Sequence, residues 1–164
     1  DGFVRKPIFK STLEQIVRQY VLHTEAVRRP ECAETPILAG KRILLVEDNL
    51  INQEIVKELL EQTGAAVDAA YNGREGADRY ASMEDGYYDL ILMDIQMPVM
   101  NGYEATRLIR GMNRRDAGSI PIFAMTADAF AEDIAMARQA GMDRHLSKPI
   151  DAVSLMQEIT RVLI

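Results

Sequence analysis

From residue 41 to the end of the chain, short apolar runs alternate with amphipathic stretches, and this alternation limits the fold more than any other feature. The longer runs are rich in Ile, Leu and Val and are long enough for strands buried on both faces. The candidate strands are Arg42–Val46, Ala66–Ala70, Tyr88–Met93, Ile120–Met125 and His145–Leu146. Buried strands alternating with helices predict an α/β fold, in which five βα units form a parallel sheet covered on both faces.

The stretch after each candidate strand has helical periodicity and its own start or stop signals. The predicted helices are Leu50–Gln62, Gly73–Met83, Tyr103–Met112, Ala129–Gln139 and a last one from Asp151 through Leu163. Asn49 and Asp151 are predicted N-caps, and Gly64 and Gly141 are predicted to end helices. The residues expected to face the core are Ile51, Ile55, Leu59 and Leu60 from the first helix, and Val153, Met156, Ile159 and Val162 from the last.

Composition narrows the class of protein. The net charge of −6 over 164 residues argues against direct binding to a nucleic-acid backbone. The one cysteine, Cys32, excludes an internal disulfide and a cysteine-based zinc cluster. Uninterrupted apolar runs of about four residues exclude a transmembrane span. We therefore expect a soluble, cytoplasmic protein without membrane contact. Because the chain begins with Asp1 rather than Met, we expect it to be a fragment of a longer protein, whose other parts could include a membrane anchor.

The charge divides the chain into two parts. Residues 1–40 carry six Lys and Arg against five Asp and Glu, whereas residues 41–164 carry 13 against 20. Two prolines and a glycine, Pro30, Pro36 and Gly40, lie near the boundary and discourage regular structure. We therefore expect a linker over residues 26–40 and a complete domain over residues 41–164.

Polar side chains follow the apolar strands at the points where these strands end. Glu47 and Asp48 follow the first candidate strand, Asp94 the third, Thr126 the fourth, and Lys148 the fifth. Because the carboxyl ends of parallel strands meet at one edge of a sheet, we expect these groups to converge. Crowded carboxylates need a cation among them, and hard oxygen ligands suit Mg²⁺, with Mn²⁺ as an alternative. An aspartate in such a site can act as a nucleophile and form an aspartyl-phosphate.

Four strings, ILLVEDN, DLILMDIQMPVMNGYEA, PIFAMTADAF and HLSKPID, together make residues 41–164 resemble the receiver domain of two-component response regulators. Asp48 and Asp94 are 46 residues apart, Asp94 and Thr126 are 32 apart, and Thr126 and Lys148 are 22 apart. Ordered motifs at predicted strand ends are far more specific than any one of them alone. The resemblance implies a flavodoxin-like (βα)5 three-layer fold with strand order 2-1-3-4-5.

The resemblance also implies a role for each site residue. Asp94 would be the phosphoacceptor and a metal ligand, Asp48 would bind Mg²⁺ directly, and Glu47 would assist through water. Gln96 would offer its backbone carbonyl to the metal. The residues implied to contact the phosphoryl group are Thr126, Ala127 and Lys148, and those implied to act as a conformational switch are Thr126 and His145.

Each of these residues also has an ordinary structural interpretation. Asp48 could form a turn before a helix, Thr126 could cap the fourth helix, and Lys148 could be a solvated loop residue. His145 is smaller and more polar than the aromatic residue that the family often has at this position, and a passive role in the strand is an alternative to a switch. For the group as a whole, the order and the placement at strand ends favour the functional interpretation.

Residues 1–25 repeat the pattern of the last βα unit. At an offset of 142 residues, Phe3–Ile8 aligns with His145–Ile150, so that Lys6-Pro7-Ile8 matches Lys148-Pro149-Ile150. We therefore interpret residues 1–25 as the end of a preceding receiver-like domain, as in a hybrid sensor histidine kinase with tandem receivers. An unpaired unit of this kind must dock its apolar stripe elsewhere, and docking between two copies would make a dimer. A chance amphipathic helix is the alternative.

The predicted function is that of a phosphoacceptor in a two-component phosphorelay. Asp94 would take a phosphoryl group from the dimerisation domain of a histidine kinase. It would pass this group to a histidine phosphotransfer domain, or it would regulate its own kinase. Within the family, a transcription regulator is the alternative, which a chain ending at Ile164 without an output domain disfavours. A Mg²⁺-dependent phosphatase with an aspartate nucleophile needs a second aspartate where Gln96 stands. A flavin carrier would not place Glu47 and Asp48 against a phosphate.

Overall fold

The computed structural model describes residues 37–127 and 130–164, and the statements below refer to these. The strands are β1 (Arg42–Val46), β2 (Ala66–Ala70), β3 (Leu90–Asp94), β4 (Ile122–Thr126) and β5 (Arg144–Ser147). The helices are α2 (Leu50–Glu61), α3 (Gly73–Ser82), α4 (Gly102–Arg110), α5 (Ala131–Ala140) and α6 (Ala152–Leu163). These elements match the predicted order: the bounds of β1 and β2 are as predicted, and the other boundaries shift by at most two residues.

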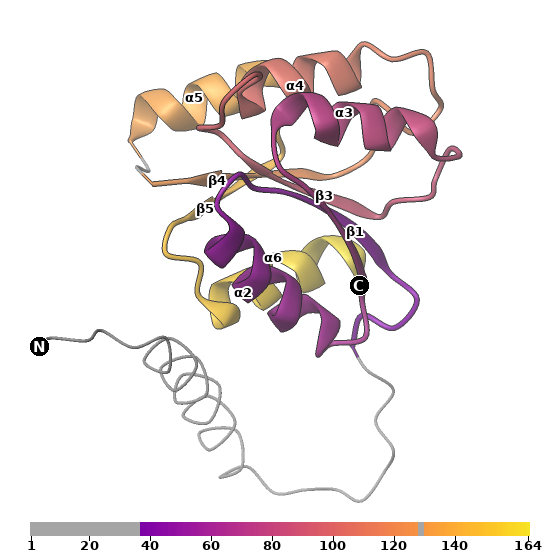
Figure 1. The fold of residues 1–164 in the computed structure, drawn as a ribbon, viewed down its shortest axis with the longest axis vertical. Helices are drawn as coiled ribbons and strands as arrows, with labels where there is room; N and C mark the ends of the chain where they lie inside the picture. Colours follow the sequence, from indigo (N-terminus) through magenta and orange to yellow (C-terminus); the bar gives the residue numbers. More distant parts are fainter. Residues whose placement is uncertain (1–36, 128–129) are drawn as a thin grey trace, which may run out of the picture. The chain divides into compact units, whose positions relative to one another are not determined.

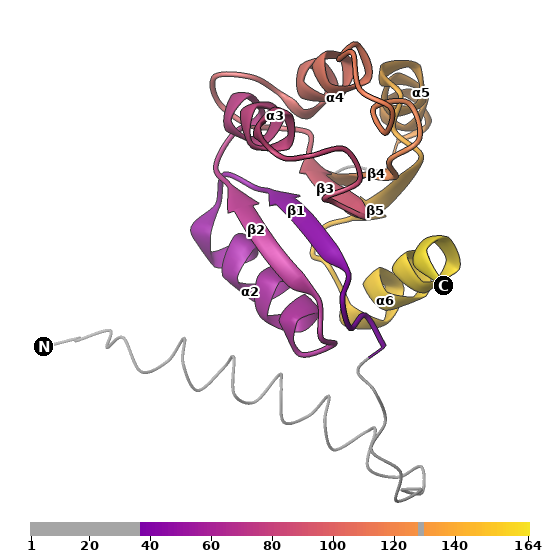
Figure 2. The ribbon, with the colours of Figure 1, turned by 90° about the vertical axis from the view of Figure 1, so that its right-hand side faces the viewer.

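The five strands form one parallel sheet in the order β2-β1-β3-β4-β5, as the resemblance implied. Helices α2 and α6 cover one face, and α3, α4 and α5 cover the other (Figures 1 and 2). Since β1 and β3 are neighbours, the residues at their carboxyl ends lie side by side.

The core consists of two apolar layers, one on each side of the sheet. Ile43 and Leu45 of β1 pack in the layer with α2 and α6, whereas Leu44 and Val46 pack in the layer beneath α3 and α4. This alternation follows from the two-residue period of a strand. The four side chains are fully buried, as a strand covered on both faces requires.

The two predicted N-caps and the predicted helix end at Gly141 are confirmed, whereas α2 ends with Gln62 as its C-cap, two residues before the predicted Gly64. The side chain of Asn49 accepts hydrogen bonds from the backbone amides of Ile51 and Asn52 at the start of α2. Asp151 accepts equivalent bonds from Val153 and Ser154 at the start of α6. Gly141 ends α5 at φ 103°, a left-handed conformation that favours glycine.

The predicted inward faces of the first and last helices are partly wrong. In α2 the buried residues are Gln53, Val56 and Leu60, and the side chain of Ile51 is 58% exposed. In α6 the buried residues are Leu155 and Ile159, and Val153 is 47% exposed. Both helices carry apolar residues on more than one face, so periodicity alone did not identify the face that the sheet buries.

The prediction that residues 1–25 are the end of a preceding receiver-like domain lies outside the described residues, as does most of the predicted linker. Leu38 falls within the predicted linker and is nonetheless fully buried. Its backbone amide donates to the carbonyl of Thr63, so this residue packs with the domain that follows. Among the described residues, no helix has the length and apolar character to cross a membrane.

Candidate functional site

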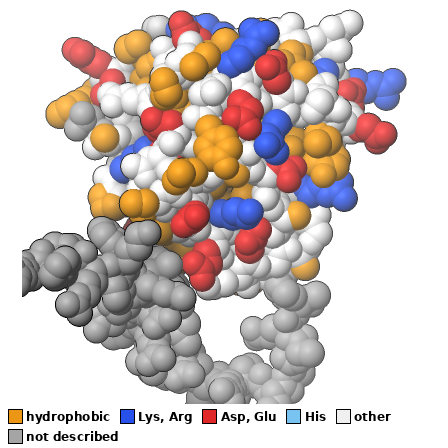
Figure 3. Space-filling model, viewed as in Figure 1, with side chains coloured by type: hydrophobic (Ala, Val, Ile, Leu, Met, Phe, Trp, Pro, Cys, Tyr) orange, Lys and Arg blue, Asp and Glu red, His pale blue; other side chains and the backbone are white. Residues whose placement is uncertain are grey.

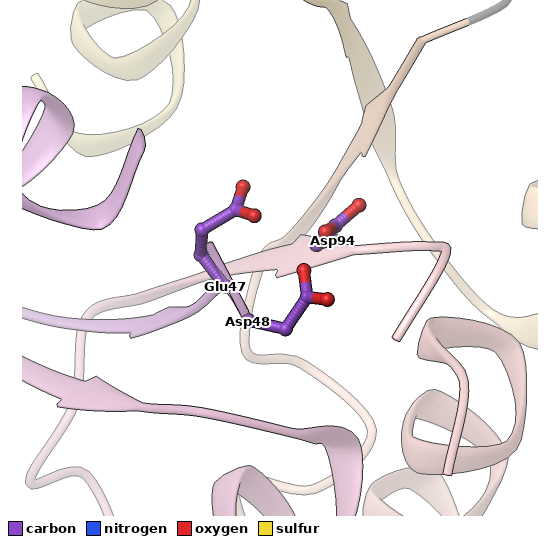
Figure 4. Close-up of side chains that lie close together, drawn as sticks. All are labelled: Glu47, Asp48 and Asp94. Carbon is purple, nitrogen blue, oxygen red and sulfur yellow. The ribbon is translucent and has the colours of Figure 1, made fainter. Parts of the chain in front are cut away.

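Three carboxylates gather at the carboxyl ends of β1 and β3. Glu47 directly follows β1, Asp48 is the next residue, and Asp94 is the last residue of β3. Each offers an oxygen, and these oxygens all lie within 4.8 Å of one another. Figure 4 shows the three side chains at this edge of the sheet. Glu47 and Asp94 are buried and Asp48 is exposed, so the group, hereafter the acidic trio, opens to solvent on the Asp48 side.

Lys148 joins two members of the acidic trio. Its Nζ lies 2.9 Å from Oε2 of Glu47 and 3.0 Å from Oδ2 of Asp94. The backbone amide of Lys148 donates to the carbonyl of Thr126 at 2.7 Å, which places the residue just past β5. One ammonium therefore offsets part of the charge of two buried carboxylates.

Burial and crowding change the acidity of these groups. Burial, and next the nearby carboxylate of Glu47, raise the pKa of Asp94 from 3.8 to about 7, against the opposing effect of Lys148. Burial alone would lower the pKa of Lys148, but its hydrogen bonds to Glu47 and Asp94 outweigh burial and raise it. The site thus has an excess of negative charge that a cation would relieve.

Hydrogen bonds from backbone amides and close packing orient the acidic side chains. The amide of Asn49 donates to Oε1 of Glu47 at 3.2 Å, and the amide of Gln96 donates to Oδ1 of Asp94 at 3.3 Å. Gly102, the first residue of α4, lies so close to Asp94 that an added Cβ would clash with the Asp94 carbonyl oxygen. Only glycine allows α4 to begin against this part of β3.

The remaining predicted site residues lie around this edge of the sheet. Thr126 is the last residue of β4, next to Ser147 in the parallel ladder, and it is buried. Ala127 and Gln96 are exposed at the ends of β4 and β3. His145 is exposed on β5, which is an edge strand of the sheet. Phe130, not Thr126, is the N-cap of α5, so the capping interpretation of Thr126 is wrong.

The acidic trio has the chemistry of a site for a divalent cation. All of its donors are carboxylate oxygens, the hard ligands that Mg²⁺, Mn²⁺ and Ca²⁺ prefer. The negative charge is only partly neutralised, because a single ammonium faces two buried carboxylates and a third, exposed one. These residues therefore fit a bound metal ion.

Sequence reasoning missed two residues that shape this site, Gln53 and Gly102. Gln53 is buried in α2, and its side chain bonds the backbone of Glu47. A polar residue in an amphipathic helix is expected on the solvent face, so the hydropathy pattern of the helix did not indicate that Gln53 is buried. Gly102 lies one residue before the predicted helix Tyr103–Met112, and its tight contact with Asp94 depends on the packing of α4 on β3.

Residues 43–160 match a family model described as the response regulator receiver domain. A probable histidine kinase 2 of Oryza sativa subsp. indica is 39% identical over 133 residues, which cover 74% of this chain and 13% of that protein. The sensor protein GacS of Pseudomonas syringae is 40% identical over 121 residues, 73% of this chain and 13% of that protein. The chain thus spans about 13% of the length of these two curated relatives.

Two solved structures show the same fold with sequence similarity. One is the receiver domain of the sensor histidine kinase PA1611 from Pseudomonas aeruginosa, with a magnesium ion coordinated in its active-site cleft. It is 37% identical, with a TM-score of 0.68, over 76% of this chain and 98% of that chain. The other is the receiver domain of Ssk1 in complex with the histidine phosphotransfer protein Ypd1 from Saccharomyces cerevisiae. It is 32% identical, with a TM-score of 0.69, over 76% and 90% of the two chains.

Proposed function

This chain belongs to the response regulator receiver domain family, and from that premise we propose that Asp94 is the residue that accepts the phosphoryl group. The domain acts in two-component phosphorelay signalling. The observation that carries the assignment to Asp94 is its position. It is the buried carboxylate at the end of a central strand, held by Lys148 at 3.0 Å and joined by Glu47 and Asp48 within 4.8 Å.

The chemistry is nucleophilic attack by a carboxylate. An oxygen of Asp94 attacks phosphorus, a new P–O bond forms, and the bond to the donor nitrogen of a phosphohistidine breaks, so that its electron pair stays on the imidazole. Lys148 stands where it can neutralise the transferring phosphoryl oxygens. Asp94 must be ionised to attack, and without metal its pKa is raised to about 7, so a cation at the acidic trio would favour the reactive carboxylate.

We assign Mg²⁺ as the cation of the acidic trio, with Mn²⁺ as a substitute. Asp48 and Asp94 would hold it directly, Glu47 through water, and the carbonyl of Gln96 would complete the protein ligands. When bound, Mg²⁺ supplies positive charge to the phosphoryl oxygens. The magnesium ion in the receiver domain of PA1611 and the oxygen-only donor set of the acidic trio support this assignment. Thr126 and Ala127 complete the proposed phosphoryl site, and Thr126 with His145 is the proposed switch.

The proposed partners are the dimerisation domain of a histidine kinase, as donor, and a histidine phosphotransfer domain, as acceptor. The relatives named as histidine kinases favour a hybrid kinase over a transcription regulator as the parent protein. The complex of the similar Ssk1 receiver domain with Ypd1 supports the second partner. On the face seen in Figure 3, acidic and basic side chains are interspersed, without the continuous basic field that a nucleic acid would attract.

Labelling with a small phosphodonor tests the assignment. We expect acetyl phosphate with Mg²⁺ to add the mass of one phosphoryl group to the protein, and we expect no addition with EDTA or in Asp94→Asn. Asp78→Asn, an exposed carboxylate in α3, is the matched control and should label like the parent. Labelling of Asp94→Asn at the parent level would overturn the assignment.

A further inference from the structure

Gln53 is a buried polar residue close to the acidic trio. In the described part of the chain, the buried polar side chains are Glu47, Gln53, Asp94, Thr106 and Thr126. Three of these belong to the site. Gln53 lies in the first half of α2, and its Nε2 donates to the backbone carbonyls of Glu47 and Ala70, each at 3.1 Å.

These two carbonyls lie just where β1 and β2 part. The last paired residues of the two strands are Val46 and Ala70. Beyond them the amide of Glu47 still donates to the carbonyl of Ala70 at 3.0 Å, and the chain then turns into α2. The carboxamide of Gln53 continues the ladder by one step, because it joins the carbonyls of Glu47 and Ala70 through one nitrogen.

As a result, every polar group of Glu47 is engaged. Its amide bonds Ala70, its carbonyl bonds Gln53, and its carboxylate accepts from the amide of Asn49 and pairs with Lys148. Glu47, Asp48 and Asp94 repel one another, and in a partly buried site this repulsion is weakly screened. The bonds to the main chain of Glu47 hold the turn against this repulsion.

We propose that Gln53 is a positioning residue for the cation site, which preforms the acidic trio by holding the backbone at Glu47. The inference rests on the proposed function only in taking the acidic trio as the place where Mg²⁺ binds. A carboxamide suits the task because it has two N–H donors for two buried carbonyls. A methionine has similar length and no donor, so it would remove the bond to the Glu47 carbonyl and leave the Ala70 carbonyl with the backbone amide of Glu47 alone.

Calorimetric titration with Mg²⁺ tests the proposal without any measurement of phosphorylation. We expect Gln53→Met to stay folded and to bind Mg²⁺ about tenfold more weakly than the parent, a ratio equivalent to about 1.4 kcal/mol. Leu60→Ala is the control, because it removes a buried side chain at the far end of the same helix. It should lower stability as much or more, and leave Mg²⁺ affinity unchanged.

The outcomes separate the two claims. A parent protein that binds no Mg²⁺ contradicts the proposed cation site itself. If the parent binds Mg²⁺ and the folded Gln53→Met variant binds it with the same affinity, the proposed role of Gln53 is overturned and the cation site stands. A result in which Gln53→Met and Leu60→Ala lose affinity in proportion to their loss of stability overturns the role of Gln53 in the same way.

A second measurement covers the case in which Gln53→Met does not fold. In the metal-free parent protein, the side-chain amide protons of Gln53 should exchange slowly with solvent in NMR spectra, and Mg²⁺ should change their exchange little. Fast exchange that becomes slow only when Mg²⁺ is added would mean that the metal, not Gln53, organises the turn.

Discussion

At the scale of single residues, the ionised carboxylate of Asp94 is unfavourable for the stability of the metal-free fold. It is almost fully buried, beside Glu47, and has one ammonium within reach. Its pKa rises from 3.8 to about 7, so the folded protein holds this proton more tightly than the unfolded chain. Without metal, the contribution of Asp94 to stability is therefore greatest at low pH and declines as pH rises from about 4 through 7.

Asp94→Asn should consequently stabilise the metal-free protein at pH 8. We expect a gain on the order of 1–3 kcal/mol, because the neutral amide avoids burying a charge beside Glu47. The gain should be smaller at pH 5, where the folded parent is already protonated at Asp94. Urea unfolding in EDTA at the two pH values measures both differences. A variant less stable than the parent at pH 8 would contradict this account, and Asp78→Asn should show no comparable dependence on pH.

Val99, in the loop between β3 and α4, has the left-handed φ of 68° although it is β-branched. Its side chain is 82% exposed, so little packing compensates for this conformation. We expect Val99→Asn to stabilise the protein by about 1 kcal/mol, because asparagine tolerates this region of φ and ψ. Val99→Ile, which keeps the β-branch, is the control and should be neutral. Thermal unfolding measures the effect, and a lower melting temperature for Val99→Asn would show that the strain is not there.

At the scale of elements, Arg114 connects the loop before β3 with the loop before β4, at the edge of the sheet opposite the acidic trio. Its guanidinium donates to the carbonyls of Tyr80, Met83 and Glu84, pairs with Asp116, and lies 4.2 Å from the ring centroid of Tyr80. Burial alone would raise the pKa of Asp116, but hydrogen bonds, chiefly from Arg114, hold it at about 2. This contribution is present above pH 3.8 and is lost as pH falls toward 2.

Arg114→Lys should destabilise the fold by about 2–4 kcal/mol, because a lysine cannot make the forked contacts of a buried guanidinium and leaves carbonyls unpaired. Arg115→Lys, the exposed neighbour, should change stability by less than about 0.5 kcal/mol. Urea unfolding at pH 7 measures both variants. Equal stabilities for the two variants would mean that this cluster contributes little.

The elements that could be predicted from the sequence are those whose pattern of apolar and polar residues fits only one secondary structure and one buried face. Residues Ile43–Val46 of β1 are all apolar and are buried on both faces of the sheet, as predicted. The inward faces of α2 and α6 could not be fixed, since Ile51 and Val153 are apolar but exposed. Gln53 and Arg114 carry structural roles that depend on contacts between distant segments, which a single sequence does not reveal.

At the scale of the whole molecule, the strand order brings together groups far apart in the sequence. Because β1 and β3 are neighbours, Glu47 and Asp94 meet, and β5 beyond β4 brings Lys148 to both. The placement of the site followed from the rule that parallel strands end at one edge. Which groups pair within the site could be learned only from the structure. An example is the pairing of Lys148 with Glu47 as well as with Asp94.

The same edge carries exposed apolar side chains that suit a protein partner. Leu50 and Ile51, at the start of α2, are exposed directly after the acidic pair, and Val153 is exposed at the start of α6. Removing apolar side chains from water is favourable in free energy. We therefore expect a histidine phosphotransfer partner to contact this end of α2.

Ile51→Glu should therefore slow phosphoryl transfer to such a partner at least tenfold, and leave labelling of Asp94 by acetyl phosphate unchanged. Leu108→Glu, which alters an exposed apolar residue of α4 on the other face of the sheet, should transfer at the parent rate. Single-turnover transfer from the labelled domain measures both rates. Parent-like transfer by Ile51→Glu would exclude this surface.

The most direct test of the central claim is to locate the phosphoryl group. After labelling with acetyl phosphate and Mg²⁺, borohydride reduces an aspartyl-phosphate to homoserine, and peptide mass spectrometry then identifies the converted residue. We predict homoserine at position 94, in the peptide that contains Met93 and Ile95, and at no other aspartate. Homoserine at Asp48 or elsewhere, with Asp94 intact, would contradict the account.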